Sequence, residues 1–155
     1  MYHPGFASAW LSKAPGDDVD AYKGDGDWFK ILQVVGRTGQ SANLSDPTIG
    51  HDPAKIMWGT FNSDSVSCVF SPCTLAPFIR GSGLIFVLLQ WNFTIPATTP
   101  PGKYLVRFEH IFPNVVDAQF YLACAHIEIK NSGQVGTPGP LVKIPGVYQR
   151  GQKGE

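Results

Sequence analysis

The chain has 155 residues, the length of one domain or of part of one. Its 12 basic and 12 acidic side chains give a formal net charge of zero, so no surplus of positive charge marks a partner such as nucleic acid or an anionic membrane. Hydrophobic residues make up 43% of the chain, which excludes disorder throughout. The longest apolar run, Leu84–Leu89, is far shorter than the ~20 residues that a transmembrane helix needs.

Short segments of alternating side chains recur along the chain, separated by loops rich in Gly and Pro. In chain order, the pattern predicts strands over residues 6–13, 28–33, 91–95, 104–111 and 118–130. In the last, Phe120, Leu122, Cys124, His126 and Glu128 share one face and Gln119 and Tyr121 the other. Since no helical periodicity exceeds a turn or two, the sequence predicts an all-β fold, an immunoglobulin-like or fibronectin-like β-sandwich with long loops.

Isolated chemical groups leave the function open. The histidines His3, His51, His110 and His126 include possible metal ligands, but a lone His is more often a surface or core residue. Glu109 and Glu128 are on neighbouring predicted strands, where a structural or salt-bridge role is favoured over glycosidase chemistry. The cysteines Cys68, Cys73 and Cys124 are odd in number, so one lacks a partner within the chain.

Five blocks, taken together and in order, carry a resemblance. They are HPGFASAWLSK at residues 3–13, WFK at 28–30, PATTPPGKYLVRFEHI at 96–111, AQFYLACA at 118–125 and VKIPGVY at 142–148. These resemble segments of the fungal lytic polysaccharide monooxygenases of auxiliary activity family nine, formerly glycoside hydrolase family sixty-one. The blocks cover most of the chain and occur in the family's order.

The resemblance implies oxidative cleavage of cellulose or related β-glucans at one copper ion. By position in the motifs, His3 matches a copper-ligating imidazole, Tyr121 the axial ligand and Gln119 the side chain that positions the oxygen species. Imidazole nitrogen in a tetragonal arrangement suits Cu(II). Tyr148 matches a tyrosine of the flat substrate-binding face. Cys124 matches a disulfide cysteine whose partner is missing from this chain; if unpaired, it is expected to be a buried thiol.

The resemblance also implies an incomplete domain. The chain begins Met1-Tyr2, where no signal peptide is expected, whereas the family's copper site uses the amine and imidazole of a mature N-terminal His. The expectation is therefore a partial catalytic domain over residues 1–148, truncated at the N-terminus, with a polar tail at 149–155. Residues 66–90 are expected to be an atypical insertion or a gene-model artefact.

The expected function is that of a copper-dependent enzyme whose full-length parent is secreted, monomeric and supplied by an external electron donor. The chain as written is expected to have little or no activity, because it lacks the N-terminal His. The alternative is a non-catalytic β-sandwich that binds polysaccharide or copper, and a further possibility is a product that does not fold stably.

Overall fold

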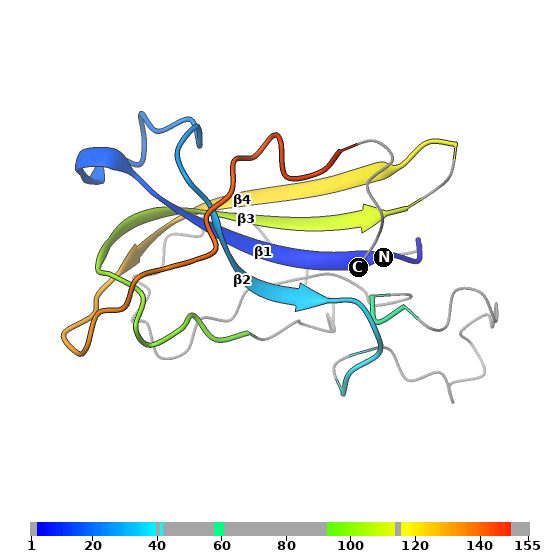
Figure 1. The fold of residues 1–155 in the computed structure, drawn as a ribbon, viewed down its shortest axis with the longest axis horizontal. Coiled ribbons are helices and arrows are strands. Elements are labelled where there is room, and N and C mark those ends of the chain that lie inside the picture. The colour runs from blue at the N-terminus through cyan, green and yellow to red at the C-terminus, as the bar shows by residue number, and fades with distance from the viewer. Residues whose placement is uncertain (1–2, 40, 42–57, 61–92, 114–115, 150–155) are drawn as a thin grey trace, which may run out of the picture.

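Four antiparallel strands form one sheet in the computed structural model, which describes residues 3–39, 41, 58–60, 93–113 and 116–149. The strands are β1 (Phe6–Lys13), β2 (Phe29–Val34), β3 (Gly102–Phe112) and β4 (Gln119–Ile129), and their order in the sheet is β2-β1-β3-β4 (Figure 1). A single 3-10 turn, η1 (Pro15–Asp17), follows β1. The all-β prediction is therefore confirmed. The described part of the chain has no helix long and apolar enough to span a membrane.

Four of the five predicted strands agree with the sheet: residues 6–13 coincide with β1, and the ends of the other three differ by one or two residues. The prediction of a strand over 91–95 is wrong for its described part, residues 93–95, which lie outside the sheet. Phe93 and Ile95 are nevertheless buried and Thr94 is exposed. Alternating burial therefore persists here without a hydrogen-bonded strand.

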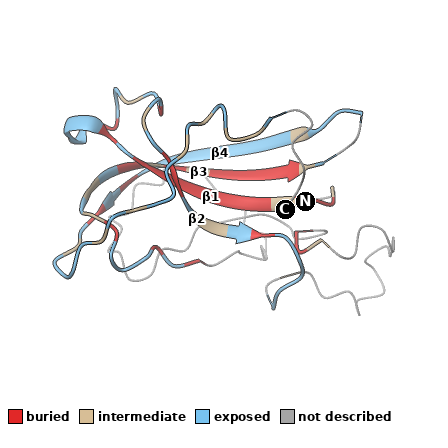
Figure 2. Ribbon diagram, in the orientation of Figure 1, coloured by how far each residue is buried: buried red, intermediate tan, exposed pale blue. Residues whose placement is uncertain are grey.

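One face of the sheet, called here the core face, carries the hydrophobic core. Leu11, Tyr104, Val106 and Ile127 pack there with residues of β2 and the 93–95 segment, in two adjoining clusters. The central strands β1 and β3 are mostly buried, whereas β4 at the edge is exposed along most of its length (Figure 2). Pairing on both sides and coverage of the core face explain the burial of the two central strands.

The C-terminal segment, residues 142–148, crosses the opposite face of the sheet, called here the polar face (Figure 1). Val142 and Trp28 exchange two backbone hydrogen bonds of 2.9 Å, which fix the segment where β2 begins. The polar face contains the buried side chains of Ser8, Trp10 and Glu109. The segment thus covers groups that the antiparallel register has gathered from β1 and β3.

The expectation of a buried thiol at Cys124 is wrong, because the side chain is free and exposed. Cys124 lies in the middle of β4, at the edge of the described sheet, where neither the core nor the C-terminal segment covers it. Residues 66–90, with Cys68 and Cys73, lie outside the described residues, as do His51 and most of the 149–155 tail.

Candidate metal centre

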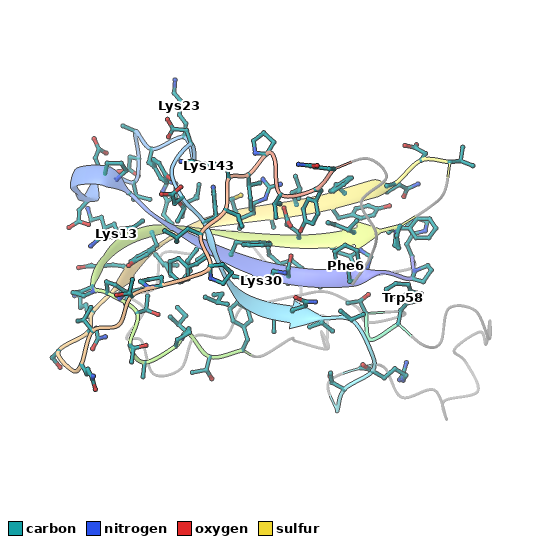
Figure 3. All side chains as sticks on the ribbon, viewed as in Figure 1. Phe6, Lys13, Lys23, Lys30, Trp58 and Lys143 are labelled. Carbon is teal, nitrogen blue, oxygen red and sulfur yellow. The ribbon has the colours of Figure 1, made fainter. Side chains whose placement is uncertain are left out.

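Three aromatic rings meet at the end of the sheet where β1 begins, β3 ends and β4 begins. Phe6 and Trp58 mark this end, and Lys13 marks the opposite one (Figure 3). The His3 ring stacks on Phe112, with centroids 4.7 Å apart and planes 13° apart. It also stacks on Tyr121, at 6.0 Å and 21°. The fold brings His3 and Tyr121 into one site, although 118 positions separate them in the sequence.

The register of the last two strands explains why Tyr121 and Gln119 face His3. Tyr121 pairs with His110, and Gln119 pairs with Phe112. Alternation along β4 puts Gln119 and Tyr121 on the core face. The Tyr121 hydroxyl donates a hydrogen bond of 2.5 Å to Gln119 Oε1. The phenol oxygen keeps its lone pairs, and the amide nitrogen of Gln119 carries two further donor hydrogens.

His110 is the fourth ring of this group, called here the ring cluster (His3, His110, Phe112 and Tyr121). Its own ring centroid lies 5.7 Å from that of Tyr121, and only 2% of the residue is exposed. Its Nε2 lies 3.1 Å from Thr60 Oγ1, and that hydroxyl donates to the Gly5 carbonyl at 2.9 Å. The sequence marked His110 as one of four histidines but did not predict its contacts with Tyr121 and Thr60.

Burial lowers the pKa of His110 from its usual 6.5 to about 4, and nearby positive charge, including that of His3, adds to the effect. The unfolded chain then binds more protons than the folded chain between pH 6.5 and 4. This stabilising contribution is complete above pH 6.5 and is lost as the pH falls toward 4. We expect a loss of about 3 kcal/mol from this group for the metal-free protein.

Urea unfolding of the wild type and of His110→Gln at pH 7 and pH 4.5 measures this effect. The variant is expected to lose less stability on acidification than the wild type. Equal losses in the two proteins would contradict the assignment.

Gly5 brings the segment that carries His3 into close contact with β3. A Cβ atom at this position would lie 2.1 Å from the backbone oxygen of Ile111. We expect Gly5→Ala to lower the free energy of unfolding by about 2 kcal/mol or more, because backbone must move to admit the methyl group. Gly39→Ala is the matched control, since a Cβ there meets nothing within 4 Å. Equal unfolding midpoints for the two variants would refute the close approach.

Tyr148 lies on the polar face, so the structure does not bring it together with the ring cluster. Its hydroxyl donates a hydrogen bond of 2.6 Å to Glu109 Oε2, and its ring lies 5.9 Å from that of Phe120. Burial, followed by the hydrogen bond to Glu109, raises the pKa of Tyr148. The residue is half-buried, which leaves part of the ring accessible.

Glu109 is fully buried and accepts hydrogen bonds from four side chains. The sequence did not reveal this role. Oε2 accepts from Ser8 at 3.3 Å, Trp10 at 3.1 Å and Tyr148. Oε1 accepts from Arg107 Nε at 2.6 Å. This group of five side chains is called here the carboxylate cluster. It joins β1 and β3 to the C-terminal segment.

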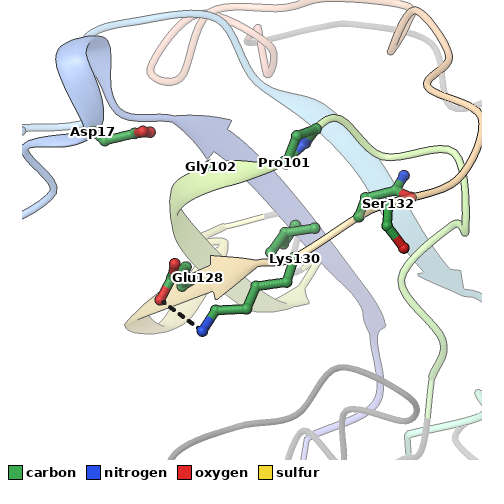
Figure 4. A pocket seen from close by; sticks show the side chains of 8 residues that line it. Asp17, Pro101, Gly102, Glu128, Lys130 and Ser132 are labelled. Atoms are coloured by element: carbon green, nitrogen blue, oxygen red, sulfur yellow. Dashed lines mark ion pairs between the residues drawn. The ribbon is translucent and has the colours of Figure 1, made fainter.

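The pairing of Glu109 with Glu128 that would suit a glycosidase is absent. Glu109 lies opposite Leu122, and Glu128 lies opposite Lys103, which puts the two carboxylates about 20 Å apart at ~3.4 Å per residue. Glu128 instead lines an open groove of about 470 Å³ with Asp17 and Lys130 (Figure 4). The fourth histidine, His126, has its Nδ1 atom 3.3 Å from Oδ1 of Asp20.

No set of three or more His, Cys, Asp or Glu side chains gathers for metal binding among the residues that the structure describes. The ring cluster instead brings together two groups of different kind that could hold a metal, the imidazole of His3 and the phenol oxygen of Tyr121. Both side chains belong to segments that the central strands hold in place.

The described sheet makes this an all-β protein, and its likeness to solved structures supports the predicted β-sandwich class. Two of these structures illustrate the likeness. The crystal structure of HiLPMO9B has a TM-score of 0.53 at 21% identity, covering 96% of this chain and 52% of that chain. The cellulose-active polysaccharide monooxygenase MtPMO3* from M. thermophila has a TM-score of 0.57 at 26% identity, covering 98% and 57%.

The chain belongs to Auxiliary Activity family 9, formerly GH61, because that family's model matches residues 1–155. It is 40% identical over 154 residues to AA9 family lytic polysaccharide monooxygenase G of Aspergillus tamarii. It is 35% identical over 149 residues to monooxygenase U of Thermothielavioides terrestris. Each alignment covers 96% of this chain, but the chain spans only 36% and 42% of those relatives. The family resemblance of the sequence is thereby confirmed.

Proposed function

We propose that the protein supplies part of the copper centre of a lytic polysaccharide monooxygenase that oxidatively cleaves cellulose or a related β-glucan. Membership of Auxiliary Activity family 9 supports the reaction. The cellulose-active title of one structural neighbour supports the substrate. The observation that carries the proposal is the convergence of the His3 and Tyr121 rings. The family also favours a secreted parent enzyme that takes electrons from an external donor.

The kinds of donor atom that the ring cluster offers are suited to copper. An imidazole nitrogen with a phenol oxygen is a ligand set that suits Cu(II). Two donors are fewer than a tetragonal ion takes, so the remaining ones must come from outside this pair. Copper, when bound, supplies the activation of dioxygen or peroxide needed to attack the C–H bond beside a glycosidic oxygen.

The chain's own side chains have distinct parts in this proposal. His3 would supply an imidazole nitrogen to the ion, and stacking holds its ring against Phe112. Tyr121 would supply its phenol oxygen, and its proton is directed to Gln119. Gln119 orients Tyr121 through Oε1 and would offer its amide N–H groups to dioxygen or peroxide near the site. These roles need no movement of the sheet, because β3 and β4 already set the positions.

Oxidised-sugar release from cellulose, with added copper and reductant, tests the catalytic part. We expect little product from this chain, because the described residues bring two proposed donors to the site, fewer than a tetragonal ion takes. Equilibrium copper binding to the same protein is expected and requires His3. Cellulose binding without any dependence of copper affinity on His3 would favour the alternative, a non-catalytic polysaccharide-binding module.

Tyr148 is proposed to contact the glucan through the accessible part of its ring, since aromatic rings present flat apolar surface to sugars. We expect Tyr148→Ala to weaken retention on cellulose several-fold and Tyr148→Phe to retain it, because the ring persists. Sedimentation with cellulose at graded loading measures this. If both variants are retained like the wild type, Tyr148 has only a structural role, through its contacts with Phe120 and Glu109.

A further inference from the structure

We propose that His110 is a positioning residue that holds His3 in place through Thr60 and Gly5. The inference deepens the proposed function and rests on it only where copper is concerned. It starts from a buried imidazole that the family motif does not assign. His110 is 2% exposed and pairs across the sheet with Tyr121 on one side and with Ala7 on the other.

The hydrogen bonds from His110 have a defined direction. The Gly5 carbonyl accepts only, so the single hydroxyl proton of Thr60 goes to it at 2.9 Å. Thr60 Oγ1 must then accept from His110, whose Nε2 lies 3.1 Å away. His110 is therefore the Nε2–H tautomer, and its hydrogen bond to Thr60 Oγ1 fixes the orientation of its ring.

This relay ties together three segments that are distant in sequence: β3, the 58–60 segment and the residues before β1. Its last acceptor, Gly5, is two residues from His3. Gly5 also lies so close to β3 that a Cβ would contact His110 Nε2 at 3.1 Å. With its backbone held there, His3 has its ring placed between Phe112 and Tyr121.

His110 acts through His3 and not as a metal ligand, because its Nε2–H donates to Thr60. Groups that orient a metal-binding His typically change metal affinity 10–100-fold when they are removed. A purely structural role would change stability without moving the His3 ring. The two roles are therefore separable by experiment.

The test compares four variants of the 155-residue protein without metal. His110→Leu removes the donor and Thr60→Val removes the relay, while His110→Gln keeps an N–H near the position of Nε2. Phe108→Leu is the matched control, since Phe108 lies two residues away on the same strand and face, in the core. The readout is the His3 ring-proton chemical shift, which stacking on Phe112 and Tyr121 displaces upfield in the wild type.

We expect the His3 resonance to move to its unstacked value in His110→Leu and Thr60→Val, and to stay in His110→Gln and Phe108→Leu. Copper affinity, measured by calorimetry, is expected to fall about 10–100-fold in the first two. An unchanged His3 shift in both Thr60→Val and His110→Leu overturns the inference whether or not copper binds. If the His3 shift moves in these two variants but the wild-type protein does not bind copper, the positioning role is upheld and the proposed copper function is refuted.

Discussion

Glu109→Gln is expected to lower the free energy of unfolding by about 3 kcal/mol, the largest stability loss among single substitutions considered for this protein. The carboxylate is 0% exposed and accepts hydrogen bonds from Ser8, Trp10, Arg107 and Tyr148. Hydrogen bonds to a charged group contribute roughly 1.5–3 kcal/mol each, and buried donors left without an acceptor cost more than the bond itself.

The amide of the Gln variant offers only one acceptor oxygen. Its NH₂ group must face donors that a carboxylate would satisfy, either Arg107 or the group at Oε2. Arg107 keeps 22% exposure of its side chain, so water recovers part of its loss. This partial hydration keeps the expected cost at the lower end of the range for a broken buried ion pair.

Chemical denaturation at neutral pH measures the effect. Glu128→Gln is the matched control, because that side chain is exposed and its contact with Lys130 is 3.9 Å, which is worth less than about 1 kcal/mol. Tyr148→Phe should cost about 1.5 kcal/mol, the lower end of the range for one hydrogen bond to a charged group, because Tyr148 is partly exposed. A Glu109→Gln protein as stable as Glu128→Gln would show that the carboxylate cluster does not hold the C-terminal segment.

His3→Ala is expected to reduce copper affinity by at least about 100-fold, since a direct ligand matters at least as much as a group that orients one. In the proposed copper site the His3 imidazole supplies the nitrogen donor, and its ring stacks on the Tyr121 phenol. His126→Ala is the matched control, because His126 is a half-exposed β4 histidine paired with Asp20.

Isothermal titration with Cu(II), at a pH where imidazole is neutral, measures this loss. Tyr121→Phe is expected to lower affinity less than His3→Ala, because imidazole nitrogen is a stronger ligand for Cu(II) than a phenol oxygen that keeps its proton. Affinities that fall equally in His3→Ala and His126→Ala would indicate adventitious binding at exposed histidines.

The sheet was predictable because its strands alternate apolar and polar residues and end at turn residues such as Pro101 and Gly102. That pattern placed Gln119 and Tyr121 on one face of β4. It failed at residues 93–95, where burial alternates without strand pairing. A period of two indicates which face a side chain occupies but not which residue lies opposite.

The two polar networks therefore escaped sequence analysis. Glu109 meets Ser8 only because β1 and β3 pair in one particular register. His110 meets Thr60 through a segment that no strand pattern marks. Convergence of His3 on Tyr121 followed from the family motifs, since neither spacing nor composition relates two residues so far apart in the chain.

The most direct test of the copper centre is electron paramagnetic resonance of the protein loaded with one equivalent of Cu(II). We expect a tetragonal signal with imidazole-nitrogen coupling that disappears in His3→Ala, persists in His126→Ala and changes its parameters in Tyr121→Phe. A spectrum identical in wild type and His3→Ala would contradict the account, because copper would then be bound away from the site where the His3 and Tyr121 rings meet.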